Sequence, residues 1–267
     1  MCTLVILRRP GHAWPVLIGA NRDELVHRPW KPPGRHWPDR AGVTAGLDVE
    51  AGGSWLGAND EGVVAGVLNR TGSLGPQAGK RSRGELVLDA LDHADAQDAA
   101  AALARIDGRA YRTFNLVIAD ARDAFLLCHH GAADGRVDVA PIGPGLSMIT
   151  SLELNDRASP RIAGSLDRFR AAAPPDPEAG DWSGWSSLLA DRSRHLPDDP
   201  SSALTIATDH GYGTVSSSLI ALPETAEQRI VWLFSAGPPD RAPWRPVGVP
   251  ADSPDSQSSA NSGLASQ

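Results

Sequence analysis

Val16-Leu17-Ile18-Gly19-Ala20-Asn21-Arg22-Asp23-Glu24 is an apolar run that ends abruptly in four polar residues. Its apolar part predicts a buried β-strand, and residues 2–8 predict a second one. Pro10-Gly11-His12 lies between the two and supplies a turn. We therefore expect the strands to pair, so that the polar tetrad lies at the exit of the strand beside the one that carries Cys2. The alternative for the tetrad is a solvated turn with a surface ion pair.

Cys2 is the second feature with chemical content. An initiator methionine is normally removed when a small residue follows it, and removal of Met1 would leave Cys2 with a free α-amine beside its thiol. Reference pKa values of about 7.7–8.0 for an α-amine and about 8.5 for a thiol place both groups near neutrality. The amine can then act as the base for its own side-chain nucleophile. The simpler alternative is that any small residue can follow Met1.

The remaining pattern predicts a layered α+β domain, because strands at both ends of the chain enclose grouped helices. The expected strands also include residues 52–57, 61–69, 114–118, 124–128, 146–150, 216–222 and 230–235, and the expected helices include a segment after Ser82 and residues 98–106, 160–171 and 182–195. Residues 28–34 are rich in proline, which predicts a surface loop. Residues 238–267 are rich in proline, serine and glycine, which predicts a disordered tail after a domain of residues 1–237.

Composition narrows the class of protein. The chain has 267 residues, with 25 Lys and Arg against 32 Asp and Glu, so its formal net charge is −7. A protein that binds nucleic acid duplexes would need a basic face to meet the phosphates. No apolar stretch is long enough to span a bilayer, and no signal segment opens the chain, so we expect a soluble cytoplasmic protein. Two cysteines without a CxxC or HExxH pattern predict neither a disulfide framework nor a metal site.

Several motifs together resemble those of the NRDE family, also called the transport-and-Golgi-organisation-protein-2 family. The tetrad Asn21-Arg22-Asp23-Glu24 gives that family its name. The other matching segments, in order, are Met1-Cys2, Gly53-Ser54-Trp55-Leu56-Gly57, Val67-Leu68-Asn69-Arg70, Ser82-Arg83-Gly84-Glu85-Leu86 and Phe114-Asn115-Leu116-Val117. Each motif is short, but their ordered occurrence over roughly residues 1–235 is specific.

This resemblance implies a four-layer αββα sandwich of the N-terminal-nucleophile hydrolase type, similar to choloylglycine hydrolases and penicillin V acylases. It also implies that Cys2 is the nucleophile, that Asp23 is the partner of its α-amine, and that Asn69 is an oxyanion donor. A well-placed donor of that kind contributes about 3 kcal/mol to transition-state stabilisation. Asn21 and Arg22 are further candidates for binding the oxyanion or the substrate.

Three positions depart from the pattern of the relatives. Such acylases carry an arginine close before the Asn-x-Asp motif, where this chain has Ala20. Val215 stands where the NRDE family usually has an arginine, and Ser151 stands where a second oxyanion asparagine is usual. Asn155 lies four residues after Ser151, and we expect that a loop can bring it back to the site. These departures weaken the expectation of efficient amide hydrolysis.

Other motifs are less informative. Adjacent histidines in Cys128-His129-His130 would point to opposite faces of a strand, so the end of a strand is the better interpretation than a metal site. Asp209-His210-Gly211-Tyr212-Gly213 is either a functional loop or a glycine-mediated turn. The basic residues between Gln77 and Arg83 either bind an anion such as phosphate or an acyl-CoA, or form a solvated loop.

Two functions of different classes remain. The first is a cysteine amidohydrolase that cleaves a small amide or thioester through an acyl-Cys2 intermediate and requires no cofactor. The second, which the resemblance implies, is a carrier that binds haem or an acyl-CoA-type lipid in the same cleft. Cys2 and Asp23 favour the first, whereas Ala20, Val215 and Ser151 favour the second. A scaffold without a ligand is the third possibility.

Overall fold

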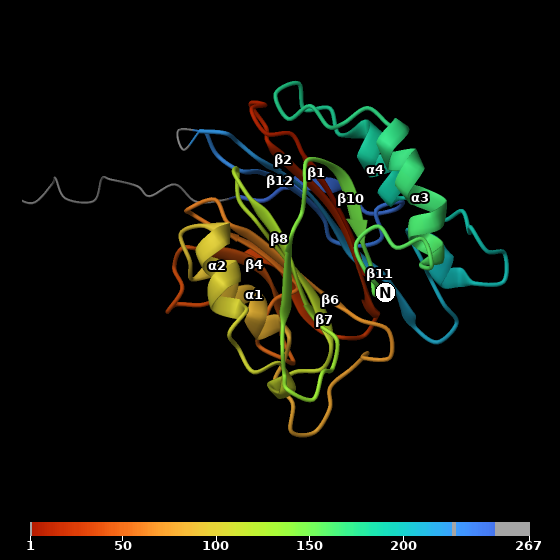
Figure 1. The fold of residues 1–267 in the computed structure, drawn as a ribbon. Coiled ribbons are helices and arrows are strands. Elements are labelled where there is room, and N and C mark those ends of the chain that lie inside the picture. Colours follow the sequence, from red (N-terminus) through yellow and green to blue (C-terminus); the bar gives the residue numbers. More distant parts are fainter. Residues whose placement is uncertain (1, 226–227, 249–267) are drawn as a thin grey trace, which may run out of the picture.

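Two antiparallel β-sheets packed face to face form the centre of the molecule, with a pair of helices on each outer face (Figure 1). The computed structural model describes residues 2–225 and 228–248. One helical pair is α1 and α2, and the other is α3 and α4. Their bounds are α1 Gly84–Leu91, α2 Ala96–Leu103, α3 Pro160–Ala171 and α4 Ser183–Leu189, with short 3-10 helices at Gly108–Ala110 and Pro200–Ser202. The layers therefore follow the order α, β, β, α.

The first sheet carries the N-terminal strand in its interior. Its order is β10 (Gly145–Ile149), β1 (Thr3–Arg8), β2 (Val16–Leu25), β11 (Tyr212–Leu222), β12 (Val231–Ser235) and β13 (Trp244–Pro246). β1 and β2 pair antiparallel with Thr3 opposite Asn21, which confirms the expected pairing of these strands. β2 and β11 pair over a long stretch whose register shifts between Thr214 and Ser216, at the end nearest the tetrad.

The second sheet is an antiparallel meander in sequence order. Its strands are β3 (Trp30–Gly34), β4 (Val43–Asp48), β5 (Leu56–Asn59), β6 (Val64–Asn69), β7 (Phe114–Ala119), β8 (Ala124–His129) and β9 (Asp138–Pro141). The proline-rich segment is thus an edge strand, β3, rather than the loop that the sequence predicted. An edge strand tolerates Pro32 and Pro33 because one side of it needs no ladder hydrogen bonds.

Strand alternation builds three apolar layers. Leu4 and Ile6 of β1 pack into the layer between the two sheets, whereas Val5 packs toward α3 and α4. The third layer lies between α1, α2 and the second sheet. α3 has the bounds that the sequence predicted, and its apolar residues Ile162 and Phe169 pack on the first sheet. The tetrad Asn21-Arg22-Asp23-Glu24 lies on β2, whose two faces pack against the layer between the sheets and the layer that contains α3 and α4.

The C-terminal boundary differs from the prediction. β13 pairs with β12, and Trp244 packs against the layer that contains α3 and α4. Asp240 also pairs with Arg192, at 2.6 Å. The predicted boundary at Pro238 was therefore wrong, because Trp244 and the pairing of β13 with β12 hold residues 238–248 on the domain. The rest of the predicted tail, residues 249–267, lies outside the described residues.

None of the described helices combines the length and the apolar sequence that crossing a membrane requires.

Candidate functional site

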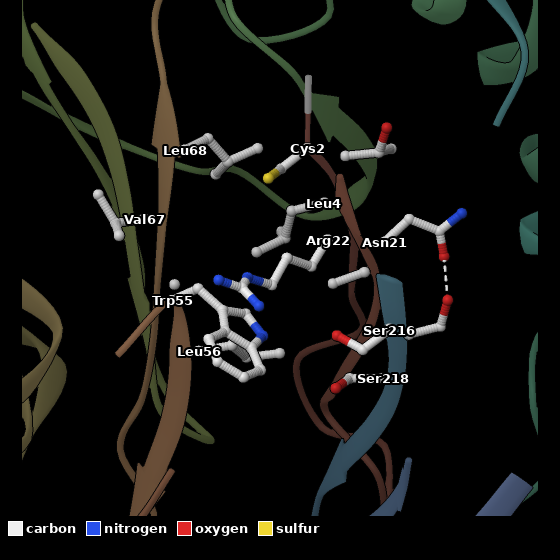
Figure 2. A pocket seen from close by; sticks show the side chains of 14 residues that line it. Cys2, Leu4, Asn21, Arg22, Trp55, Leu56, Val67, Leu68, Ser216 and Ser218 are labelled. Atoms are coloured by element: carbon white, nitrogen blue, oxygen red, sulfur yellow. Dashed lines mark hydrogen bonds between the residues drawn. The ribbon is translucent and has the colours of Figure 1, made fainter. Parts of the chain in front are cut away.

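A pocket lies between the two sheets beside the N-terminal end of β1 (Figure 2). It encloses about 340 Å³ of empty space, part of which is open to solvent. Its walls come from β1, β2, β6 and β11 and from Trp55 and Leu56. Both Cys2 and Arg22 line the pocket, so two of the candidate residues share one cavity.

The Cys2 thiol is half-buried in the pocket wall and lies against the tetrad. Its Sγ is 3.7 Å from the main-chain oxygen of Asp23. Burial raises the pKa of the Cys2 thiol, the negative charge of Asp23 adds to this, and the positive charge of Arg22 opposes it. The thiol therefore needs a nearby base to become a thiolate near neutral pH.

The Asp23 carboxylate is fully buried and is held by two elements distant in the chain. Oδ2 accepts a hydrogen bond from Nη1 of Arg161 at 2.8 Å, and Oδ1 accepts one from the Thr214 hydroxyl at 2.7 Å. The same Nη1 also donates to the Thr3 hydroxyl at 2.8 Å. Arg161 comes from the first turn of α3, so this helix fixes the carboxylate beside the strand that carries Cys2.

Tyr212 completes this cluster from the start of β11. Its hydroxyl donates to the main-chain oxygen of Asp23 at 2.9 Å, so it shares that acceptor with Cys2 Sγ. Burial raises the pKa of the Tyr212 hydroxyl, and the neighbouring negative groups act in the same direction. The neutral phenol is therefore the form present over the whole physiological pH range.

Arg22 points into the pocket, on the face of β2 opposite Asn21 and Asp23 (Figure 2). Its guanidinium carbon lies 4.1 Å from the ring centroid of Trp55, and Nη2 is 3.4 Å from Oδ2 of Asp48. Strand alternation places Arg22 on the face opposite its neighbours. In this fold that face is the one that contains the Cys2 thiol.

Asn21 was predicted to bind the oxyanion or the substrate, but in the structure its side chain makes hydrogen bonds within the fold. Its amide nitrogen donates to the carbonyls of Leu189 and Leu204, at 2.9 and 3.0 Å, and its amide oxygen accepts from Ser217 at 2.5 Å. Both amide hydrogens are thus engaged on the α4 side of the sheet. An oxyanion in the pocket would find no donor there.

Asn155 returns to the first sheet, but not to Cys2 as expected. Its main-chain nitrogen donates to the carbonyl of Met148, and its side-chain oxygen accepts from the main-chain nitrogen of the same residue, both at 2.8 Å. Its amide nitrogen donates to the Ser147 hydroxyl at 3.2 Å. Asn155 therefore provides hydrogen-bond partners for the outer edge of β10, one strand beyond β1. Its φ is positive, at 60°, within the loop that follows β10.

Ser151 and Asn69 lie at the same end of the sandwich. Continuing the register Leu4↔Ile149 by two residues places the buried Ser151 opposite Cys2. Its hydroxyl accepts from Thr71 at 3.1 Å. Asn69 ends β6 directly after Leu68, which lines the pocket. Neither position overturns the predicted donor roles, which stay predictions.

Two of the three positions that depart from the pattern of the relatives, Ala20 and Val215, lie close to the site. Ala20 lines the pocket and leaves room beside Arg22. Val215 is the extra residue in the bulge between Thr214 and Ser216, and it is buried. Although neither position offers an arginine, Arg161 supplies one to Asp23 from α3.

A second cluster of ligand-type atoms lies away from the tetrad. The side chains of Cys128, His130 and Glu153 offer atoms within 4.8 Å of one another. Arg70 pairs with Glu153, and burial raises the pKa of the Cys128 thiol to about 11. A guanidinium already in the cluster and a protonated thiol disfavour a cation there. The expectation of no metal site stays a prediction.

Sequence reasoning missed Arg161 and the exact role of Tyr212. Tyr212 stood in the segment that the sequence offered as either a functional loop or a glycine-mediated turn, so its glycine-flanked position was the available signal. Arg161 gave no signal, because it belongs to an amphipathic helix 138 residues from its partner Asp23.

Comparisons with known proteins agree with this geometry. The match to the family described as Transport and Golgi organisation 2 covers residues 1–231. The Transport and Golgi organization protein 2 homolog of Bos taurus is 35% identical over 147 residues, which are 51% of this chain and 51% of the relative. The chain thus spans about half the length of the curated relatives it matches.

Solved structures share the fold at low sequence identity. A Caenorhabditis elegans N-acylethanolamine-hydrolyzing acid amidase ortholog gives a TM-score of 0.55 at 13% identity, covering 85% of this chain and 96% of that chain. A variant of the conjugated bile acid hydrolase from Clostridium perfringens gives 0.50 at 12%, covering 92% and 96%. The expected αββα sandwich of the N-terminal-nucleophile hydrolase type is confirmed. Together with the match over residues 1–231, these findings show that the chain belongs to the Transport and Golgi organisation 2 family.

Proposed function

We propose that Cys2, exposed as the N-terminal residue by removal of Met1, is the nucleophile of a hydrolase that acts on a small thioester or amide. The observation that supports this best is the position of its thiol. It lies in the wall of an apolar pocket, against the main chain of Asp23 and beside Arg22 and Tyr212. A titratable nucleophile among such groups in a cleft is a candidate for catalysis.

The chemistry needs one base and one acyl intermediate. The α-amine of Cys2 accepts the thiol proton, and Sγ forms a bond to the substrate carbonyl carbon. When the tetrahedral intermediate collapses, the bond to the amine or thiol leaving group breaks, and the ammonium of Cys2 returns the proton to that group. Water, deprotonated by the same amine, then attacks the thioester, which releases a carboxylic acid and restores the Cys2 thiol.

Asp23 orients the amine in this proposal. Arg161 holds the Asp23 carboxylate next to Thr3, the residue that follows Cys2. An ammonium on Cys2 gains a buried counter-charge from that carboxylate, and the neutral Tyr212 phenol fixes the main chain of Asp23. Ser151, opposite Cys2 in the extended register, and Asn69 remain the candidates for oxyanion donors.

Thioesters suit the site better than amides. Asn21 has both amide hydrogens engaged elsewhere, the Asn155 amide donates to Ser147, and one lost oxyanion donor costs about 2.7–4 kcal/mol of transition-state stabilisation. A thioester has a more reactive carbonyl and a better leaving group than an amide. It therefore needs less help from the oxyanion site.

Intact mass spectrometry tests the proposal with p-nitrophenyl acetate as the acyl probe. We expect a protein that lacks Met1 and gains one acetyl group, with peptide mapping placing that group on Cys2. The acetyl group should be lost on standing in buffer, and Cys2→Ala should not be acetylated. A protein that retains Met1, or a Cys2→Ala variant that is acetylated like the wild type, contradicts the proposal.

A carrier is the second candidate, and the apolar walls of the pocket favour it. Leu4, Leu56 and Leu68 give the cavity the character of an acyl-chain site. Haem fits less well, because Cys2 is the only described lining residue that can ligate its iron, and burial keeps that thiol protonated. If the protein binds a fatty acyl thioester at Cys2 without consuming it, the carrier is the correct function.

A further inference from the structure

Arg22 has an unused hydrogen-bond donor inside the pocket. Its side chain is only 5% exposed, yet it lines the cavity beside Cys2 (Figure 2). Nη2 faces Asp48 at 3.4 Å and the guanidinium plane covers the Trp55 ring, whereas Nη1 has no hydrogen-bond partner among the described residues. A buried polar group without a partner is costly, and such groups are rare in native structures. A ligand acceptor that meets Nη1 would remove this cost.

Ser216 presents a second unused group to the same cavity. Its Oγ is buried and also has no hydrogen-bond partner among the described residues. Ser217, the next residue, turns to the opposite face of β11 and donates to Asn21. β11 therefore adds one hydroxyl donor, that of Ser216, to one wall of the pocket. Trp55, which contacts the Arg22 guanidinium, belongs to the opposite wall on the side of the second sheet.

The charge balance around Arg22 favours an anion. Asp48 is mainly the partner of Arg28, which binds both of its carboxylate oxygens, at 2.8 and 3.1 Å. Glu50 also pairs with Arg28 rather than with Arg22. Arg83 adds a further positive charge near Cys2, and burial together with repulsion from Arg112 lowers its pKa to about 10, which still leaves it charged. Glu24 and Asp48 both oppose part of the positive charge of Arg22, and its Nη1 keeps no hydrogen-bond partner among the described residues.

From these contacts we infer that the pocket recognises a carboxylate, which Arg22 binds through Nη1 and Ser216 binds through its hydroxyl. The planar guanidinium fork matches a planar carboxylate, and hydrogen bonds between such charged groups are stronger than neutral ones. The inference rests on the proposed function in one respect: the carboxylate belongs to the molecule whose carbonyl Cys2 attacks. The substrate class is then an acyl thioester or amide that carries a carboxylate within a few bonds of the scissile carbonyl.

Iodoacetate and iodoacetamide test this directly, because they have nearly the same shape and differ in charge. Each is reacted separately with the protein at pH 8, and peptide mapping gives the alkylation rate of Cys2. We expect the ratio of the iodoacetate rate to the iodoacetamide rate to be about ten-fold higher for Cys2 than for N-acetylcysteine, since one charged hydrogen bond gives about that factor. Arg22→Gln should abolish the difference, and Arg22→Lys should reduce it.

Arg40→Gln is the matched control, since Arg40 also pairs with an aspartate, Asp89, but does not line the pocket. It should leave the ratio unchanged. The iodoacetamide rate reports independently whether each variant keeps the Cys2 environment intact. An equal ratio for Cys2 and N-acetylcysteine in the wild type, or an equal loss of preference in Arg40→Gln, overturns the inference.

Ligand binding separates this inference from the proposed function. Butyrate and butyramide are titrated while the thermal midpoint is measured, because a ligand that binds the native state raises it. Butyrate alone should raise the midpoint, and Arg22→Gln should remove that effect. If neither alkylating reagent labels Cys2, the proposed nucleophile fails and the butyrate titration still decides the carboxylate site. Equal shifts with butyrate and butyramide, or no shift with either, would refute the site.

Discussion

At the scale of single residues, the buried ion pair of Asp23 and Arg161 gives the clearest prediction about stability. Their side chains are 0% and 1% exposed and 2.8 Å apart. Arg161→Met removes one partner and leaves a buried carboxylate uncompensated, which should lower the free energy of unfolding by about 3–5 kcal/mol. Urea denaturation measures this. The exposed pair of Arg157 and Asp167 is the control, because Arg157→Met should cost at most about 1 kcal/mol. Equal losses would show that the buried pair does not hold the site.

The two thiols should differ in their dependence on pH. Burial raises the pKa of Cys128 to about 11, so at pH 8 only about one molecule in a thousand carries its thiolate. Cys2 is half-buried whereas Cys128 is buried, so iodoacetamide at pH 8 should label Cys2 first, and labelling of Cys128 should increase as the pH approaches 11. A raised folded-state pKa also means that Cys128 stabilises the fold below the thiol's ordinary pKa, and that this contribution is lost as the pH rises toward 11. Faster labelling of Cys128 than of Cys2 at pH 8 contradicts this order.

Sequence patterns located some of the site residues and missed others for a physical reason. Cys2, Arg22 and Asp23 were found because they lie on two paired strands that are close in the chain. Asn21 and Asn155 were assigned binding roles, but their side chains make hydrogen bonds within the fold, since a residue type does not reveal which partners surround it. The contacts of Asp23 with segments 138 and 191 residues away form only through tertiary folding.

At the scale of secondary structure elements, a glycine on β4 positions the support of Arg22. A Cβ atom at Gly46 would lie 2.3 Å from the Trp55 ring, so only glycine allows the indole to pack there. Gly46→Ala should move Trp55, lower the stability by about 1–3 kcal/mol and reduce the iodoacetate preference of Cys2. Gly143→Ala is the control, because nothing lies within 4 Å of a Cβ at that position. Unchanged stability and preference in Gly46→Ala would show that Trp55 does not support Arg22.

The elements themselves were predicted unevenly. Strong periodicity or continuous apolar runs identified α3, β7 and β8 almost to the residue. β3 was missed because prolines normally interrupt strands, and its place at a sheet edge depends on the meander as a whole. β9 is only four residues long and mostly exposed, as another edge strand, and so it left no pattern to detect.

At the scale of the whole molecule, β13 completes the first sheet and links it to the helical layer. It pairs Ser235 of β12 with Trp244, and Asp240 binds Arg192 just after α4. A chain that ends at Gly237 loses this strand pair, the ion pair and the packing of one indole. Burial of part of an aromatic side chain stabilises by about 1–3 kcal/mol, which corresponds to several degrees in a domain of this size.

Two truncated chains test this assignment by their thermal midpoints. The chain that ends at Gly237 should melt several degrees below the full chain, whereas one that ends at Gly248 should melt with it, because the composition of residues 249–267 offers little apolar surface to bury. Trp244→Ala in the full chain should reproduce most of the first loss, which separates indole packing from strand pairing. If the chain that ends at Gly237 melts like the full chain, β13 adds no stability and the domain ends where its sequence composition changes. If the chain that ends at Gly248 is also destabilised, residues beyond it contribute to the fold.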